Sequence, residues 1–272
     1  MSLVHFNFES QYLNCNTDIN VILPDKPRDK EPVDFYKREN RYKVLWLLHG
    51  TFGDYTDWVR KSNIELYACE KNLIVVMPSG LNANYSDWGA MMGINMFSYL
   101  TEELMPLIHN WFPASDKRED NFISGLSMGG EGALKYRLNH PDKFAGVAVL
   151  SMFAPDWENY NGTKGFGSER DKESFRNAGG YDKFVDSYQN LRKILRENKD
   201  NGTLPRMYFA CGKNDFLYDR FTEFRNWATE IGLDAVFEET EGYTHEWRFW
   251  DLAIQHALTF FGLDEKDEGN PY

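Results

Sequence analysis

Residues 125–129, with the sequence GLSMG, contain the pattern Gly-x-Ser-x-Gly, in which a serine hydroxyl can act as a nucleophile. The apolar run 121–124 precedes this pattern, and a helix start rich in small residues follows it. A strand, a sharp turn and a helix in this order form a nucleophile elbow, because the turn lifts the serine clear of the sheet. A glycine-rich structural turn with an incidental serine is the alternative, but the context favours Ser127 as a nucleophile.

A serine hydroxyl needs a base to take its proton, and the base is expected near the end of the chain. Where an elbow carries the nucleophile, the acid and then the histidine follow it in the sequence. His245 lies between the last predicted strand and the last predicted helix, where it can reach the sheet edge, whereas His256 falls inside that helix. We therefore predict His245 as the base and structural roles for the other histidines, which are His5, His49, His109, His140 and His256.

The acid should follow the end of a strand, accept a hydrogen bond from the imidazole and fix its tautomer. Asp215 follows the predicted strand 206–211 and is the preferred candidate. Asp156, after the preceding strand, is the rival, and Asp219 is a weaker one because it lies inside the next predicted helix. Asp215 could instead serve only to cap that helix, a role that aspartate often takes.

Two backbone N–H groups are needed to stabilise the negative charge that develops on the substrate carbonyl oxygen. One is expected to be that of Met128, directly after the nucleophile. The other should come from the loop 49–53, which follows the predicted strand 43–48; we favour Thr51, with Phe52 next. Taken alone, this loop could be an ordinary strand-ending turn, so the assignment depends on the elbow.

Aromatic and methionine side chains in two loops could form the walls of a substrate pocket. Trp88 and Met91 follow the predicted strand 73–77, and Phe153 and Trp157 open the region after the strand 145–151. Apolar walls with few polar groups would suit an acyl or aryl ester. The alternative, equally weighted, is that these side chains form a small hydrophobic cluster, apart from the main core, beneath a long loop.

Short runs rich in β-branched residues alternate with segments of helical period, which is typical of a largely parallel sheet with helices on both faces. Most of these runs are almost continuously apolar, as expected for strands buried on both sides. The sequence therefore predicts an α/β fold with strands at 3–9, 17–23, 43–48, 73–77, 121–124, 145–151, 206–211 and 235–239. Apolar stripes of helical period, interpreted as core, lie within 100–111, 217–231 and 247–261.

Residues 152–200 interrupt this alternation with a glycine-containing stretch and a charged helical segment. We predict an insertion over the active-site end of the sheet and not a second domain. The chain is thus expected to form one catalytic domain, 1–263, followed by a polar tail, 264–272. The segment 24–43, rich in charge and proline, is expected to be a solvated connection.

The composition argues against several functional classes. With 30 Lys and Arg against 42 Asp and Glu, the net charge of −12 would repel a nucleic acid backbone. The apolar runs are too short to cross a membrane, and no phosphate-binding glycine motif or clustered metal ligands occur, so no membrane, cofactor or metal is expected. Three widely spaced cysteines and no visible secretion signal indicate a reduced, cytoplasmic protein, and its aromatic content is compatible with a homo-oligomer.

In four stretches the chain resembles the esterase D-like branch of the α/β-hydrolase fold. That branch includes tributyrin, feruloyl and acetyl xylan esterases and S-formylglutathione hydrolases. The matching stretches are 47–50 with Trp58 downstream, 125–130, 212–215 and 244–247, within a likeness that covers almost the whole chain. The resemblance implies a single α/β-hydrolase domain without a cofactor, a triad of Ser127, Asp215 and His245, and an oxyanion hole formed by Met128 N–H and the loop 49–52.

One departure from that branch bears on the substrate. S-formylglutathione hydrolases usually carry a cysteine-containing loop after the glycine of the oxyanion strand, whereas this chain has Thr51-Phe52-Gly53. We therefore predict a serine carboxylesterase for short-acyl or aryl esters, either small molecules or esters on a carbohydrate. The alternatives are a thioesterase of S-formylglutathione hydrolase type, an acyltransferase to a sugar hydroxyl, and a non-catalytic binding module, which the presence of all three triad residues disfavours.

Overall fold

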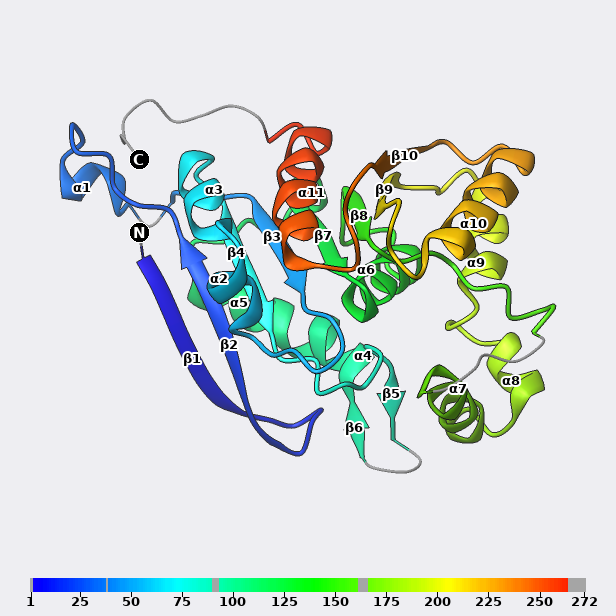
Figure 1. Cartoon of the computed structure of the whole chain (residues 1–272). Helices are drawn as coiled ribbons and strands as arrows, with labels where there is room; N and C mark the ends of the chain where they lie inside the picture. The colour runs from blue at the N-terminus through cyan, green and yellow to red at the C-terminus, as the bar shows by residue number, and fades with distance from the viewer. Residues whose placement is uncertain (1, 38, 90–92, 161–165, 264–272) are drawn as a thin grey trace.

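A mostly parallel sheet lies at the centre of the molecule (Figure 1), in a computed structural model that describes residues 2–37, 39–89, 93–160 and 166–263. Within these residues, eight strands form the sheet in the order β1-β2-β4-β3-β7-β8-β9-β10. The pairs β1–β2 and β2–β4 are antiparallel, and from β4 to β10 neighbouring strands are parallel. The strands are β1 (Ser2–Ser10), β2 (Cys15–Leu23), β3 (Val44–Leu48), β4 (Ile74–Pro78), β7 (Asn121–Leu126), β8 (Gly146–Leu150), β9 (Arg206–Gly212) and β10 (Ala235–Thr240).

Each of the eight predicted strands coincides with one of these, so the α/β fold predicted from the sequence is confirmed. Continuous apolarity was the correct signal because the central strands are buried on both faces. In β3, Val44 and Trp46 belong to one hydrophobic core and Leu45 and Leu47 to the other. A short hairpin of β5 (Asp87–Trp88) and β6 (Ile94–Asn95) was not predicted.

Helices cover both faces of the sheet. The core on one side takes side chains from α3 (Ile64–Glu70) and α11 (Trp247–Phe260). The opposite core takes side chains from α5 (Met105–Trp111), α6 (Met128–Asn139), α9 (Leu191–Asp200) and α10 (Tyr218–Glu230). Short helices before β7 are α1 (Pro32–Phe35), α2 (Asp57–Lys61), α4 (Met96–Ser98), a π-helix η1 (Tyr99–Leu104) and a 3₁₀ helix η2 (Arg118–Asp120).

The predicted insertion divides into two parts. α7 (Phe166–Asn177) and α8 (Tyr181–Val185) lie beyond the end of the sheet, at the lower right of Figure 1. There Trp157 packs edge-on against Phe175 and Phe184, in an aromatic cluster that belongs to neither main core. α9, in contrast, packs Leu191 and Leu195 into the main core, so the last part of 152–200 belongs to the helical layer and not to an insertion.

Two other sequence expectations concern segments at the margins of the fold. The connection 24–43 contains the four-residue helix α1, although most of its residues are exposed or half-buried, as predicted. The predicted tail 264–272 lies outside the described residues. In the part of the chain that the structure describes, no helix is both long enough and apolar enough to span a bilayer.

Candidate active site

Ser127 occupies the turn between β7 and α6, in a backbone conformation with φ 52° and ψ −121°. A non-glycine residue rarely adopts such a positive φ, and holding one there costs about 1–3 kcal/mol. The Ser127 N–H donates to Leu150 O over 2.8 Å, which fastens the turn to β8. The side chain makes no capping hydrogen bond to α6, although the residue occupies the N-cap position. The predicted order of strand, sharp turn at Ser127 and helix is therefore confirmed.

Glycine is required beside Ser127 because backbone passes directly against this turn. A Cβ built on Gly129 would lie 2.5 Å from the carbonyl oxygens of Leu48 and His49, and one on Gly125 would overlap the backbone of Gly129. These contacts bring α6 against the end of β3. The elbow and the loop after β3 are consequently held at a fixed separation.

The Gly129→Ala variant is expected to lose about 3 kcal/mol of unfolding free energy, because strand backbone cannot move aside for the new methyl group. Urea denaturation measures this loss. Gly89→Ala is the matched control, since its Cβ would meet only the end of the Asn95 side chain. Equal stability of the two variants would contradict the close approach at Gly129.

The structure pairs the two other predicted triad residues. Asp215 follows β9, His245 follows β10, and His245 Nδ1 lies 2.8 Å from Asp215 Oδ2. The second carboxylate oxygen of Asp215 accepts the backbone N–H of Leu217 at 2.9 Å, just before α10. Asp215 thus contacts the imidazole and also accepts a hydrogen bond from Leu217, the N-cap residue of α10, without being the cap itself. The Asp215 side chain is fully buried and that of His245 is 18% exposed, which leaves the ring open to one side.

Two aromatic rings fix the plane of the His245 imidazole. Trp250 of α11 meets it edge-on at 5.0 Å, and Phe216 lies against it at 4.7 Å between ring centroids. Trp250 is itself anchored, because its indole N–H donates to Ser151 Oγ over 3.0 Å. The imidazole is therefore oriented by one hydrogen bond and two ring contacts.

The rival residues lie in structural settings. Asp156 accepts hydrogen bonds from the backbone and side chain of Asn159 and lies 3.4 Å from Arg192. Although partial burial raises its pKa, these hydrogen bonds leave the pKa of Asp156 below its usual value. His256 is an exposed residue of α11, with Nδ1 2.8 Å from Glu238, and Asp219 lies in the first turn of α10.

The loop after β3 is braced by the buried side chain of His49. The Gly80 N–H donates to His49 Nε2 over 2.7 Å, so Nε2 carries no proton and Nδ1 must be the donor to Gly50 O, also at 2.7 Å. Burial lowers the pKa of His49, which favours this neutral form. A neutral imidazole with one fixed tautomer thus ties the loop to the segment after β4.

Acidification below pH 6.5 is expected to destabilise the protein. Burial lowers the pKa of His49, His109 and His140 in the fold, so the unfolded chain binds more protons below pH 6.5. The stability that these neutral rings contribute is complete above the unfolded pKa of about 6.5, and it is lost as the pH falls toward their folded pKa values. Each ring can contribute up to about 1.4 kcal/mol per pH unit in that window.

Urea denaturation at pH 8 and pH 5.5 measures this effect. In the His140→Phe variant the difference between the two pH values should shrink, because phenylalanine keeps the stacking on Phe97 and does not titrate. Unfolding free energies that are equal at both pH values in the unmodified protein would contradict the prediction.

The predicted oxyanion residues follow at the tip of the same loop. Thr51 Oγ1 accepts a hydrogen bond from Arg170 Nη1 over 2.8 Å. Phe52 has φ 64°, and its N–H donates to Asn82 Oδ1 over 2.6 Å. Because the Phe52 N–H is engaged with Asn82, the geometry ranks Thr51 ahead of Phe52 as a donor toward the cavity.

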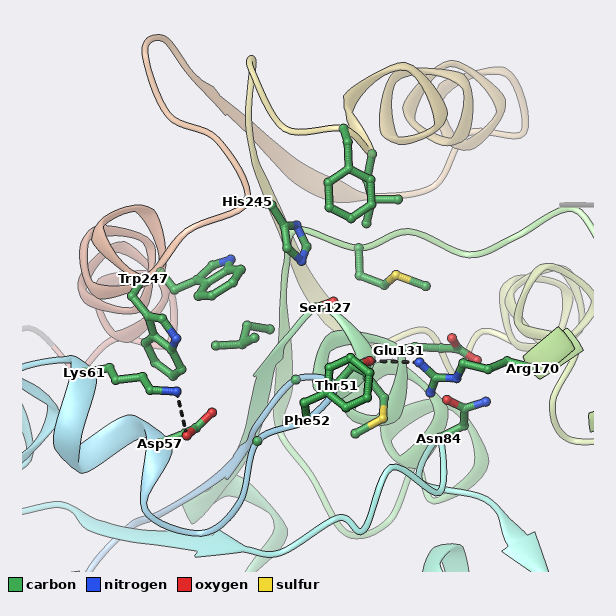
Figure 2. A pocket seen from close by; sticks show the side chains of 18 of the residues that line it. Thr51, Phe52, Asp57, Lys61, Asn84, Ser127, Glu131, Arg170, His245 and Trp247 are labelled. Atoms are coloured by element: carbon green, nitrogen blue, oxygen red, sulfur yellow. Dashed lines mark hydrogen bonds and ion pairs between the residues drawn. The ribbon is translucent and has the colours of Figure 1, made fainter. Parts of the chain in front are cut away.

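Ser127 and His245 face a cavity of about 710 Å³ at the carboxyl ends of the parallel strands (Figure 2). Met128, Thr51 and Phe52 line it as well. Further lining residues come from α2, the segment after β4, the end of β7, α6, the loops after β8 and β9, α7 and α11; among them are Asp57, Lys61, Asn84, Leu126, Glu131, Met152, Arg170, Phe216, Trp247 and Trp250. The volume is within the range of small-molecule sites.

The expected pocket walls need correction. Phe153 is buried in the main core and Trp157 in the aromatic cluster of the insertion, and neither lines the cavity. Trp88, in the small hairpin, donates its indole N–H to Ala83 O over 2.7 Å and is not a lining residue. Met91 lies outside the described residues. Sequence reasoning identified aromatic loops, but it could not tell a side chain that faces a cavity from one that fills a core.

Charged and aromatic lining residues were missed instead. Lys61 pairs with Asp57 at 2.8 Å and stacks over the Trp247 ring, on one side of the cavity. Arg170 and Glu131 lie on the other side in Figure 2. A position two residues after the predicted histidine was a signal for Trp247, whereas Arg170 looked like one charge among many on a solvated helix.

Comparison with known proteins agrees with this geometry. An acetyl esterase of Caldicellulosiruptor saccharolyticus is 34% identical over 278 residues, covering 95% of this chain and 97% of that protein. The Staphylococcus aureus fluorophosphonate-binding serine hydrolase FphF superposes with a TM-score of 0.78 at 29% identity, covering 96% of this chain and 98% of that one. An S-formylglutathione hydrolase (FrmB) of the same organism gives a TM-score of 0.77 at 28% identity, with the same coverages. The model of the Esterase family, described as "Putative esterase", matches residues 10–261. The chain therefore belongs to the Esterase family and is a carboxylic ester hydrolase.

Proposed function

We propose that this protein hydrolyses short-acyl or aryl carboxylic esters through an acyl-enzyme on Ser127. The observation that carries the proposal is that Ser127, on a strained elbow, opens onto the same cavity as His245, whose ring is held by Asp215. Nucleophile, base and orienting acid are supplied by the ends of three parallel strands. This is the arrangement that acyl transfer through a serine requires.

The reaction proposed has two halves. Ser127 Oγ attacks the ester carbonyl while His245 Nε2 takes its proton, since Nδ1 is engaged with Asp215. The N–H groups of Met128 and Thr51 stabilise the oxyanion, supported by the positive end of the α6 dipole. Proton return from His245 releases the alcohol, and water, activated by the same imidazole, then releases the acid.

Relatives and cavity lining support the substrate class. The relative from C. saccharolyticus is an acetyl esterase. Leu126, Met152, Phe216 and Trp250 supply apolar lining near the two proposed reacting groups. A small acyl or aryl group would be desolvated there, while polar residues on the cavity sides could meet a hydroxylated alcohol.

The similarity to an S-formylglutathione hydrolase supports a second candidate, hydrolysis of a small thioester. The same proposed machinery would act on either bond, because attack on the carbonyl and stabilisation of the oxyanion are common to both. The Thr51-Phe52-Gly53 loop favours the oxygen ester.

A substrate panel tests the proposal. It comprises p-nitrophenyl acetate, butyrate and octanoate, methyl ferulate and S-formylglutathione, each compared with Ser127→Ala as the blank. We expect acetate or butyrate, or methyl ferulate, to have the highest kcat/KM, and octanoate to be poor. A best rate with S-formylglutathione would replace the proposal by the second candidate. No turnover of any member by folded protein would contradict it, and a sugar acceptor would then be added to detect acyl transfer.

A further inference from the structure

The proposed oxyanion loop, residues 50–53, is hydrogen-bonded at three consecutive residues, and two of these bonds come from distant parts of the chain. Gly50 O accepts from His49, Thr51 Oγ1 from Arg170 Nη1, and the Phe52 N–H donates to Asn82. His49 belongs to the end of β3 and Asn82 to the segment after β4. Arg170 comes from α7, which is 119 residues away in the sequence.

Arg170 lies on the side of the cavity opposite to Lys61 and Asp57 in Figure 2. In Figure 2 its guanidinium points from α7 into the cavity and donates to Thr51, with Glu131 and Asn84 on the same side in this view. Burial lowers the pKa of Arg170, and the nearby carboxylates of Glu131 and Asp171 oppose that effect. The Arg170 side chain is half-buried and charged, and a hydrogen bond from a cation to a hydroxyl is stronger than one between neutral groups.

We propose that Arg170 is a positioning residue, which holds the Thr51 N–H on the developing oxyanion by gripping the Thr51 hydroxyl. The inference depends on the proposed function, because it takes Thr51 as an oxyanion donor. Thr51 has one strongly restricted side-chain torsion, so fixing Oγ1 also fixes the adjoining backbone. Gly50 and Gly53 flank the tip, and because glycine restricts the backbone less than other residues do, contacts such as this one must define the loop conformation.

Positioning and direct substrate binding by Arg170 predict different kinetics. If the hydrogen bond from Arg170 positions Thr51, it stabilises the transition state, in which the oxyanion forms. Its loss should then lower kcat with little effect on KM. A contact with bound substrate should change KM. If Arg170 only supported the packing of α7, Arg170→Met should lower stability, and its effect on activity should not depend on whether Thr51 keeps its hydroxyl.

The experiment is a double-mutant cycle on p-nitrophenyl acetate, a small neutral substrate. We expect Arg170→Met and Thr51→Val each to lower kcat about ten-fold, with KM within two-fold of the unmodified value. Because both variants remove one hydrogen bond, the double variant should lose no more than either single one. Thr51→Ser, which keeps the hydroxyl, should lose less activity than Thr51→Val.

Arg176→Met is the matched control. It removes another arginine of α7, one that pairs with Glu173 on an exposed face, and should leave kcat unchanged. Thermal unfolding of all variants separates loss of activity from loss of fold.

Several outcomes would overturn the inference: losses that multiply in the double variant, an effect confined to KM, or an Arg170→Met variant as active as the unmodified protein. Failure of the proposed function is distinguishable, since the unmodified protein would then show no turnover above Ser127→Ala.

Discussion

Ser127→Ala is expected to abolish ester hydrolysis, with kcat reduced by about 10⁶-fold and the fold intact. The reduction is that found when a serine nucleophile is removed from such a triad, because nucleophile and base act as one unit. Alanine keeps the Cβ and differs only by the hydroxyl, so the backbone at φ 52° carries the same strain in both proteins. Steady-state hydrolysis of p-nitrophenyl acetate measures the loss, and urea denaturation should show no change in stability.

Ser124→Ala provides the matched control for this prediction. Ser124 lies three residues earlier on β7, is fully buried, and its hydroxyl has no hydrogen-bond partner among the described residues. Its removal should leave kcat unchanged. A fluorophosphonate probe should label the unmodified protein and Ser124→Ala but not Ser127→Ala. Residual turnover or labelling of Ser127→Ala near the unmodified level would show that another residue is the nucleophile.

Asp215→Asn is expected to reduce kcat by about 10⁴-fold while KM changes little. The Leu217 N–H needs an oxygen at the Oδ1 position, so the asparagine must turn its NH₂ group toward His245. An NH₂ donor facing Nδ1 forces the imidazole into the tautomer with a proton on Nε2. That nitrogen then cannot take the proton of Ser127. The prediction is checked by kcat and KM on the best ester of the panel.

Asp156→Asn tests the rival acid in the same assay. Its partners are Asn159, in the segment after β8, and Arg192 of α9, and it does not line the cavity. We therefore expect activity within a few-fold of the unmodified protein. A large loss in Asp156→Asn with an active Asp215→Asn would reverse the assignment of the acid.

The strands could be predicted from the sequence because burial on both faces leaves a strong local signal. β3, β4, β7 and β8 are buried along their whole length, and each is a short apolar run between polar segments. The helical part of 152–200 could not be divided in the same way. α9 docks on the core while α7 and α8 do not, although all three are rich in charge.

The proposed triad could be predicted because chain order and strand ends restrict its members. Ser127 sits on an elbow pattern, and His245 and Asp215 follow the last two strands. Substrate-facing residues carry no such restriction, since their role depends on the direction of a side chain. Phe153 and Trp157 are buried, whereas Phe216, 76% exposed at the cavity, was not considered.

The aromatic cluster around Trp157 has an evolutionary consequence. A segment that carries its own small hydrophobic core can be exchanged between related proteins without repacking the two main cores on the sheet. Substrate range can therefore diverge by replacement of a block, α7 with α8, while the strand ends that carry Ser127, Asp215 and His245 stay as they are. If Arg170 positions Thr51 as we propose, any replacement block would also have to supply a hydrogen-bond donor to the Thr51 hydroxyl. An exchanged block could therefore bring a new substrate preference without bringing the hydrogen-bond donor that a full turnover rate requires.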